Sequence, residues 1–358
     1  MKKTFSIILF ISFINCLAAQ NKFILHTESV DSLLDWMKKG CDKTNIFNLT
    51  RQPATQIMEQ LLKSQEKDVQ TYESTLKQFN YADSTSGNQY LLNDAYREQL
   101  KISELLNRIK HCDLSQDIYK RVIKYFPNDY SLARNYEVFF TATGWKWGDA
   151  MSFNYVNKNG DYSVTDQGTP AIIFNLALVN NTYGNNSIEQ MEALKNVMSH
   201  ELFHAILSDY IKSNWQSWNA DDINYDALLF ILNEGFAHYI SDGKPLREEY
   251  SKNTKLKQRE IKAFTSLSDS SKIIFNTKLK DEKRMNALNN GLFGKYWDKY
   301  ICITGLFMAY HIEQYNGTEA LKECIKNGPL YFVKTYHKIQ QQNKKLPKLP
   351  NAINKLIK

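Results

Sequence analysis

The chain has 358 residues, of which 43% are hydrophobic and 13% aromatic. This composition predicts a folded protein with a sizeable core and excludes an intrinsically disordered chain. The net charge of +7 is spread along the sequence, so we expect a solvated basic surface and no nucleic-acid partner.

The N-terminus predicts export. Residues 1–19 combine two early lysines with a short apolar run, which is the pattern of a secretory signal peptide. We expect a mature chain that begins near Gln20 and is periplasmic or extracellular. No later run is long and apolar enough to predict a membrane span in the mature chain.

Cysteines leave two questions open. Lipid attachment at Cys16 is an alternative to simple secretion, but Asn15 stands where a small residue is expected, so we favour secretion. In an exported chain the remaining four could form two disulfides, or they could be free buried thiols. These four are Cys41, Cys112, Cys302 and Cys324.

Residues 20–130 are predicted to be a helical N-terminal region. Apolar residues recur there at helix spacing, and no motif carries chemistry, so we expect a flanking or capping role. Residues 131–243 differ, because β-branched and aromatic residues alternate in short runs before a helical pattern. The predicted strands are 136–143, 151–156, 162–165 and 171–179. The fold class expected is therefore α+β and mostly helical, with a small sheet before the helix described next.

Residues 200–204 read His-Glu-Leu-Phe-His within this helical pattern. Residues four apart lie on one helix face, so His200 and His204 can point at one metal ion. Glu201, beside the first histidine, can take a proton from a metal-bound water, which is the mechanics of the H-E-x-x-H motif. The alternative is an ordinary helix with two surface histidines.

A second apolar helix is predicted around residues 230–240. Glu234 lies in its stripe of Phe, Leu and Ile, where a carboxylate is costly to bury unless a cation partners it. A catalytic zinc takes three protein ligands and keeps one position open, so Glu234 can complete a site for one Zn²⁺ ion with His200 and His204. His238, one turn later, is expected to support the ligands, or to replace Glu234 if that side chain turns away.

Local signals predict the ends of both helices. Ser187 and Gln190 have the spacing of a capping box for the first helix. Asp221 or Asp222 is the predicted N-cap of the second, and Gly243 is expected to follow its end.

The two helices resemble those of the gluzincin metallopeptidases. Asn-Glu-Gly-Phe-Ala at 233–237, followed by Tyr239, is similar to the third-ligand helix of the aminopeptidase type. The resemblance implies a zincin-like core, a peptide or protein substrate, His200, His204 and Glu234 as zinc ligands, and Glu201 as general base. The loop between the two motifs is longer than in the best-known families and suits a less characterised group of zinc-dependent peptidases.

The resemblance also suggests how substrate binds. In this clan an edge strand beside the zinc helix pairs with an extended substrate, a role we assign to 171–179, with Asn175 as a further contact. The strand lacks the Gly-x-Met-Glu-Asn element that grips a free amino group in the aminopeptidases. An endopeptidase or another exopeptidase mode therefore stays open.

Residues 244–358 are predicted to form a helical C-terminal lobe. Aminopeptidase-type gluzincins carry a tyrosine before a Gly-initiated helix, and a phenol there can stabilise the oxyanion. Before Gly305 the candidates are Tyr300 and Tyr296, with His311 behind them, and we favour Tyr300 as the catalytic one. The predicted function is a secreted zinc peptidase, and the alternative is a catalytically silent exported metal-binding or surface-binding module with the same fold.

Overall fold

The structure is a computed structural model that describes residues 23–66, 68–130, 134–146, 150–184, 186–215 and 222–357. The signal peptide expected at residues 1–19, with Cys16, lies outside these ranges. Among the described residues no helix is both long and apolar enough to cross a membrane.

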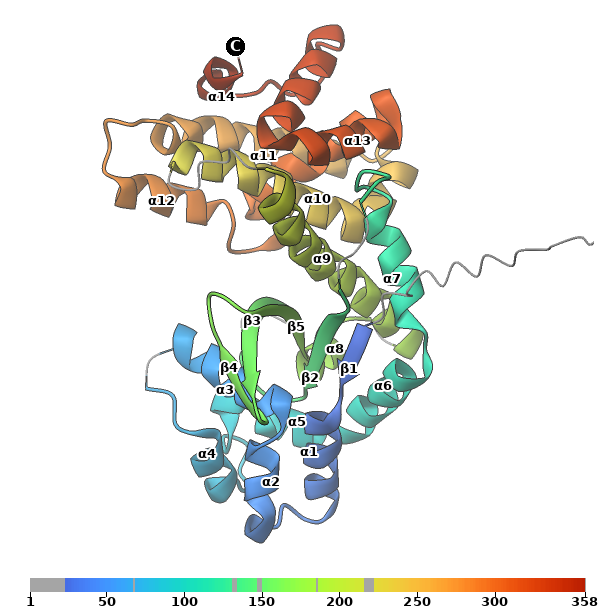
Figure 1. Ribbon diagram of the computed structural model, residues 1–358, viewed down its shortest axis with the longest axis vertical. Helices are drawn as coiled ribbons and strands as arrows, with labels where there is room; N and C mark the ends of the chain where they lie inside the picture. The colour runs from blue at the N-terminus through green and yellow to red at the C-terminus, as the bar shows by residue number, and fades with distance from the viewer. Residues whose placement is uncertain are drawn as a thin grey trace, which may run out of the picture.

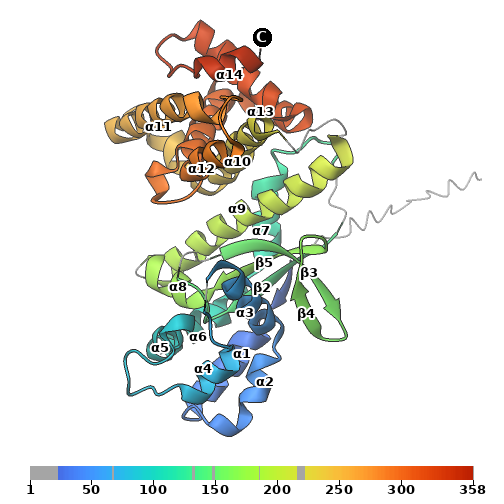
Figure 2. The same cartoon turned by 90° about the vertical axis from the view of Figure 1, so that its left-hand side faces the viewer.

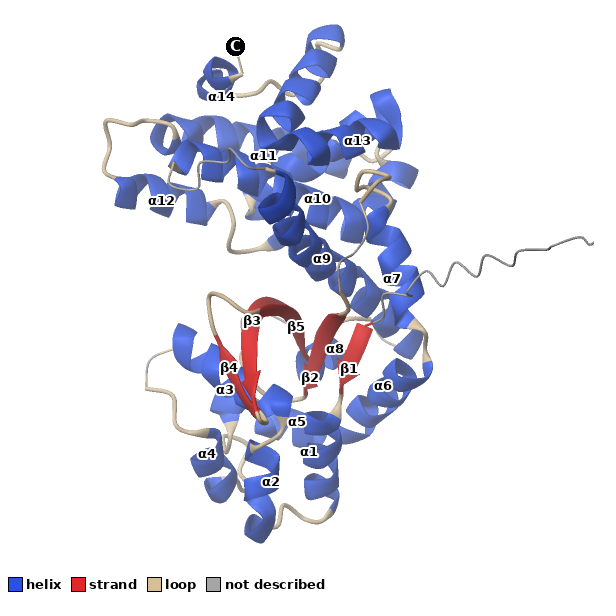
Figure 3. Ribbon diagram, viewed as in Figure 1, coloured by secondary structure: helices blue, strands red, loops and turns tan. Residues whose placement is uncertain are grey.

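A five-stranded mixed sheet lies in the N-terminal half (Figure 3). Its spatial order is β1-β2-β5-β3-β4; β1, β2 and β5 run parallel, and β3 is antiparallel to both of its neighbours. The last four strands lie where alternation predicted them, whereas β1, inside the region expected to be helical, was not predicted. The bounds are β1 Phe23–His26, β2 Tyr136–Thr141, β3 Ala150–Lys158, β4 Asp161–Val164 and β5 Thr169–Asn175.

The position of β5 corrects two expectations. Its run from Ala171 to Phe174 is fully buried, as expected for a strand covered on both faces, and it pairs with β2 on one side and β3 on the other. It is therefore a central strand and not an edge strand. It ends at Asn175, whose side chain accepts the amide hydrogen of Ala177 and caps α8 (Leu176–Thr182). Asn175 is fully buried and cannot contact a substrate.

Helices flank the sheet on opposite sides (Figure 1, Figure 2). α1 and α3 contact β2, and α3 also contacts β4, whereas α9 contacts β3 and β5. The sheet and its helices belong to one continuous hydrophobic core. The N-terminal helices are α1 Glu28–Lys38, α2 Ile46–Thr50, α3 Pro53–Gln65, α4 Tyr72–Gln78, α5 Leu92–Arg97, α6 Gln99–His111 and α7 Leu114–Ile123.

The two motif helices are α9 (Ser187–Asn214) and α10 (Ile223–Glu249). The N-cap of α9 is Asn186, whose side chain accepts the first free amide hydrogens, so the predicted cap at Ser187 is wrong by one residue. Asp222 caps α10 through the amide of Asn224, as predicted. The alternative cap, Asp221, lies outside the described residues.

The predicted end of α10 at Gly243 is wrong, because the helix continues to Glu249. Gly243 is buried inside it, and a Cβ there would lie 2.9 Å from the ring of Tyr239 and 2.8 Å from Arg247. This glycine makes room for neighbouring side chains and does not terminate the helix.

A helical region completes the chain, and both views place α9 between it and the sheet (Figure 1, Figure 2). α13 breaks at Gly317 and Gly328, where φ is 78° and 81°. Gly305 does not initiate a helix; it lies inside α13 and touches α10 at Gly235. The helices are α11 Thr254–Ile274, α12 Asp281–Asn290, α13 Tyr300–Gln342 and α14 Asn351–Leu356.

Candidate metal centre

The three predicted metal ligands come together where α9 meets α10. The Nε2 atoms of His200 and His204 are 3.0 Å apart. Glu234 Oε1 lies 3.5 Å from His204 Nε2, and Glu234 Oε2 lies 3.9 Å from His200 Nε2. Donors that share a zinc ion at about 2.1 Å are separated by about 3 to 4 Å, so this set fits one ion.

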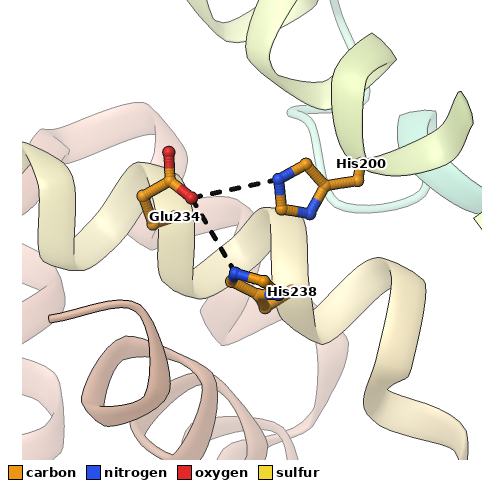
Figure 4. A group of neighbouring side chains, drawn as sticks. All are labelled: His200, Glu234 and His238. Atoms are coloured by element: carbon orange, nitrogen blue, oxygen red, sulfur yellow. Dashed lines mark ion pairs between the residues drawn. The ribbon is translucent and has the colours of Figure 1, made fainter. Parts of the chain in front are cut away.

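A further imidazole reaches the same place. His238, one turn after Glu234 on α10, has its Nε2 3.9 Å from Glu234 Oε2. Donor atoms of His200, Glu234 and His238 all lie within 4.8 Å of one another, and Figure 4 shows both imidazoles facing the carboxylate. Two donor sets, one with His204 and one with His238, therefore share His200 and Glu234.

Hydrogen bonds orient the two α9 imidazoles. His204 Nδ1 lies 2.8 Å from Asn233 Oδ1, an acceptor on α10, so this nitrogen carries the hydrogen and Nε2 presents a lone pair. The backbone of Ala237 accepts a hydrogen bond from His200. Metal-binding histidines are usually fixed in this way by a partner on the other ring nitrogen. Sequence reasoning missed Asn233, although its place beside Glu234 in the same motif was visible.

Charges around the site suit a cation. Burial, together with the imidazoles of His238 and His204, holds the pKa of His200 well below its ordinary value, which keeps this ring in the neutral form that binds metals. Burial opposes protonation of His204, but the carboxylates of Glu234 and Glu201 outweigh it and raise the pKa of that ring. Both carboxylates therefore favour a positive charge at His204, as they would favour a metal ion there.

These residues line one wall of a cavity of about 700 Å³. Glu201 lines it beside the donors, so the predicted general base faces the same space. Many of the other walls are apolar or aromatic, and the N-terminal end of β3 forms one of them. The non-donor lining includes Ala150, Met151, Tyr183, Val197, Phe230, Leu292, Phe293 and Lys299.

A family model described as "putative zinc dependent peptidase (DUF5700)" matches residues 46–345. The chain belongs to this family. The matched region contains both motif helices and most of the fold, and it agrees with a zinc peptidase at the level of class. No curated protein and no solved structure matches the chain.

In this DUF5700 member, only one of the three oxyanion candidates lines the cavity. Tyr300 begins α13 with its side chain towards α12, where its hydroxyl donates a hydrogen bond to the carbonyl oxygen of Ala287. His311 is buried in the C-terminal region, with its Nε2 2.6 Å from Glu260. Tyr296, in a 3₁₀ turn before α13, does line the cavity. The structure thus does not bring the favoured Tyr300 to the metal donors.

Asp242 links Tyr296 to His238. The Tyr296 hydroxyl donates to Asp242 Oδ2 over 2.8 Å, Ser241 Oγ donates to the same oxygen over 3.0 Å, and His238 Nδ1 lies 3.4 Å from it. Burial would raise the pKa of Asp242, but these hydrogen bonds outweigh it and hold the pKa below its ordinary value. Sequence reasoning missed Asp242, although it stands one helical turn after His238.

The cysteines bear on the site at one point. Cys302 lies with its Sγ 3.8 Å from Glu234 Oε2. Burial and this carboxylate raise the pKa of the Cys302 thiol well above its usual range. All four cysteines in the described ranges are free thiols, so of the two alternatives left open by the sequence the structure has free thiols and not disulfides.

Proposed function

We propose that this protein is a secreted zinc-dependent peptidase in which His200, His204 and Glu234 hold one Zn²⁺ ion and Glu201 is the general base. One observation carries the proposal: donors from two successive helices, α9 and α10, converge within 3.0–3.9 Å of one another at the wall of a cavity. Membership of a family described as zinc dependent peptidases supports the same class.

The zinc ion and the side chains around it would supply different parts of the reaction. Zinc, when bound, would supply a Lewis acid that polarises a carbonyl and acidifies a water molecule. Glu201 follows His200 on α9 and lines the cavity, so its carboxylate can accept the proton of the attacking water and deliver it to the leaving amine. Asn233 and the backbone of Ala237 keep the imidazoles aimed at the cavity throughout.

The substrate groove lies along β3. Of the described strands, β4 pairs with β3 only from Tyr155 to Lys158, so Ala150–Phe153 carries β5 on one edge and no strand on the other. Ala150, Met151 and Ser152 line the cavity. An extended peptide can add to such an edge through main-chain hydrogen bonds, which explains how the site takes peptides of varied sequence. We therefore assign the pairing with substrate to β3 and not, as the sequence suggested, to residues 171–179.

Mutations of Glu201 and His200 test the proposal. Wild-type protein purified without its signal peptide is expected to contain one equivalent of zinc and to cleave an unfolded protein substrate. Glu201→Gln is expected to keep the zinc and lose about 10²–10⁴-fold in rate, because it removes the proton acceptor alone. His200→Ala is expected to lose the zinc.

Each outcome separates the alternatives. Zinc that is retained without any cleavage by the wild type would favour the silent metal-binding module. Cleavage by Glu201→Gln at the parental rate would refute the general-base role. A wild type that binds no zinc would refute the metal site itself.

A further inference from the structure

We infer that His238 is a fourth protein donor to the same zinc ion, binding it through Nε2. The inference rests on the proposed zinc site and extends it, since the resemblance to gluzincins implies only His200, His204 and Glu234. Three observations on His238 carry it: its burial, the geometry of its Nε2, and the partners of its Nδ1.

Burial leaves the Nε2 atom without a hydrogen-bond partner. His238 is only 6% exposed, and its Nε2 makes no hydrogen bond within the parts of the chain that the structure describes. A buried polar nitrogen is costly to leave unpartnered, and most such atoms in native proteins have a partner. A metal ion at the donors of α9 and α10 supplies that partner.

The geometry places the Nε2 of His238 around one position with donor atoms of His200 and Glu234. Glu234 Oε2 lies 3.9 Å from His238 Nε2 and also 3.9 Å from His200 Nε2, which is too long for a hydrogen bond and within the span of two ligands on one ion. The two rings meet edge to face with centroids 4.7 Å apart. In Figure 4 both imidazoles turn a nitrogen towards the same carboxylate oxygen.

The other ring nitrogen of His238, Nδ1, has a hydrogen-bond partner, as metal-bound imidazoles usually do. Asp242 accepts from His238 Nδ1, and the hydroxyl of Tyr296 and the Oγ of Ser241 hold that carboxylate in place. Tyr296 also packs its ring edge to face on His238, with centroids 5.1 Å apart. A carboxylate on the second ring nitrogen fixes the tautomer that presents Nε2 to a metal and increases its basicity.

Four protein donors change what the site does. A four-coordinate zinc with four protein ligands has no open position, so a water or substrate oxygen must enter as a fifth ligand or displace one donor. His238 is then a group that tightens metal retention, and the coordination number in the resting protein depends on it.

X-ray absorption spectroscopy of the zinc-loaded mature chain counts the imidazoles directly. We expect three in the wild type and two in both His238→Ala and His238→Gln, the second variant guarding against loss of folding in the first. Chelator competition measures the zinc affinity, which we expect to be lower in each His238 variant. The loss should exceed the roughly 10–100-fold that removal of a hydrogen-bond partner of a metal ligand costs. Tyr296→Phe, the matched control, keeps three imidazoles and stays within that range.

The opposite results overturn the inference. Two imidazoles in the wild type, with an unchanged spectrum in both His238 variants, would show that His238 does not bind the ion while leaving the proposed peptidase site intact. A wild type that binds no zinc would instead be a failure of the proposed function. The two failures are therefore distinguishable in one set of samples.

Discussion

Gly305→Ala tests the packing that positions α10, the helix that carries Glu234. A Cβ at Gly305 would lie 1.9 Å from the carbonyl oxygen of Ile231 and 2.7 Å from the Cα of Gly235. Both atoms belong to the backbone of α10, so no side-chain rotation can relieve the clash. The two helices must separate, and Glu234, adjacent to Gly235, must move with α10.

The magnitude follows from the size of the clash. The helices must part by about 1 Å, and overpacking of this kind costs about 1–3 kcal/mol or more. Because the clash is with backbone atoms, the cost lies at the upper end of that range, at about 3 kcal/mol. Replacing a helical glycine by alanine stabilises the folded state by about 1 kcal/mol, because alanine has the higher helix propensity. We therefore expect a net loss of about 2 kcal/mol in the free energy of unfolding, and weaker zinc binding because one carboxylate is displaced.

Urea denaturation of the apo protein and chelator competition measure the two effects separately. Gly243→Ala is the matched control on α10, because the nearest atoms there belong to the side chains of Arg247 and Tyr239 and not to the backbone of another helix. Its effect on zinc affinity should be small. If Gly305→Ala has the same free energy of unfolding and the same zinc affinity as the parent, then the backbones of α10 and α13 are not in contact.

Three further outcomes are expected. Chelation of zinc should lower the melting temperature, since zinc at a hundred times its dissociation constant stabilises the folded state by about 2.7 kcal/mol. His311→Ala should cost about 1–3 kcal/mol in urea denaturation, because it removes the imidazole whose Nε2 lies 2.6 Å from the buried carboxylate of Glu260. Among the four cysteines that the structure describes, only the exposed Cys112 should react readily with a thiol reagent at pH 8; burial raises the pKa of Cys41 to about 11 and that of Cys324 to about 12, which keeps both thiols protonated until unfolding.

Sequence reasoning picked out side chains that the structure brings together as candidate metal donors, because their geometry is local. His200 and His204 are one helical turn apart, so any helix through them places both rings on one face. Glu234 was visible as a carboxylate in an apolar stripe, and His238 as its neighbour one turn later. What no local pattern gives is the distance between α9 and α10. The structure supplies it, because the two helices pack against each other and Glu234 Oε1 lies 3.5 Å from His204 Nε2.

The sheet was harder to predict because pairing partners are distant in sequence. Residues 171–179 are apolar and lead to the motif helix, which favoured a strand beside the site, yet continuous burial of Ala171–Phe174 is the mark of a central strand. β1 escaped detection because four residues are too few to show alternation and it pairs with a strand more than a hundred residues away.

The oxyanion residue illustrates the limit most clearly. Tyr300 and Tyr296 are one helical turn apart in sequence, but a 3₁₀ turn ends at Asp298 and α13 begins at Tyr300, so the two side chains leave the backbone in different directions. Tyr300 is buried against α12, whereas Tyr296 and Lys299 line the cavity. A metal ligand set is fixed by two regular helices, but a group that faces the substrate depends on the connection between elements, where one residue of offset decides which side chain enters the cavity.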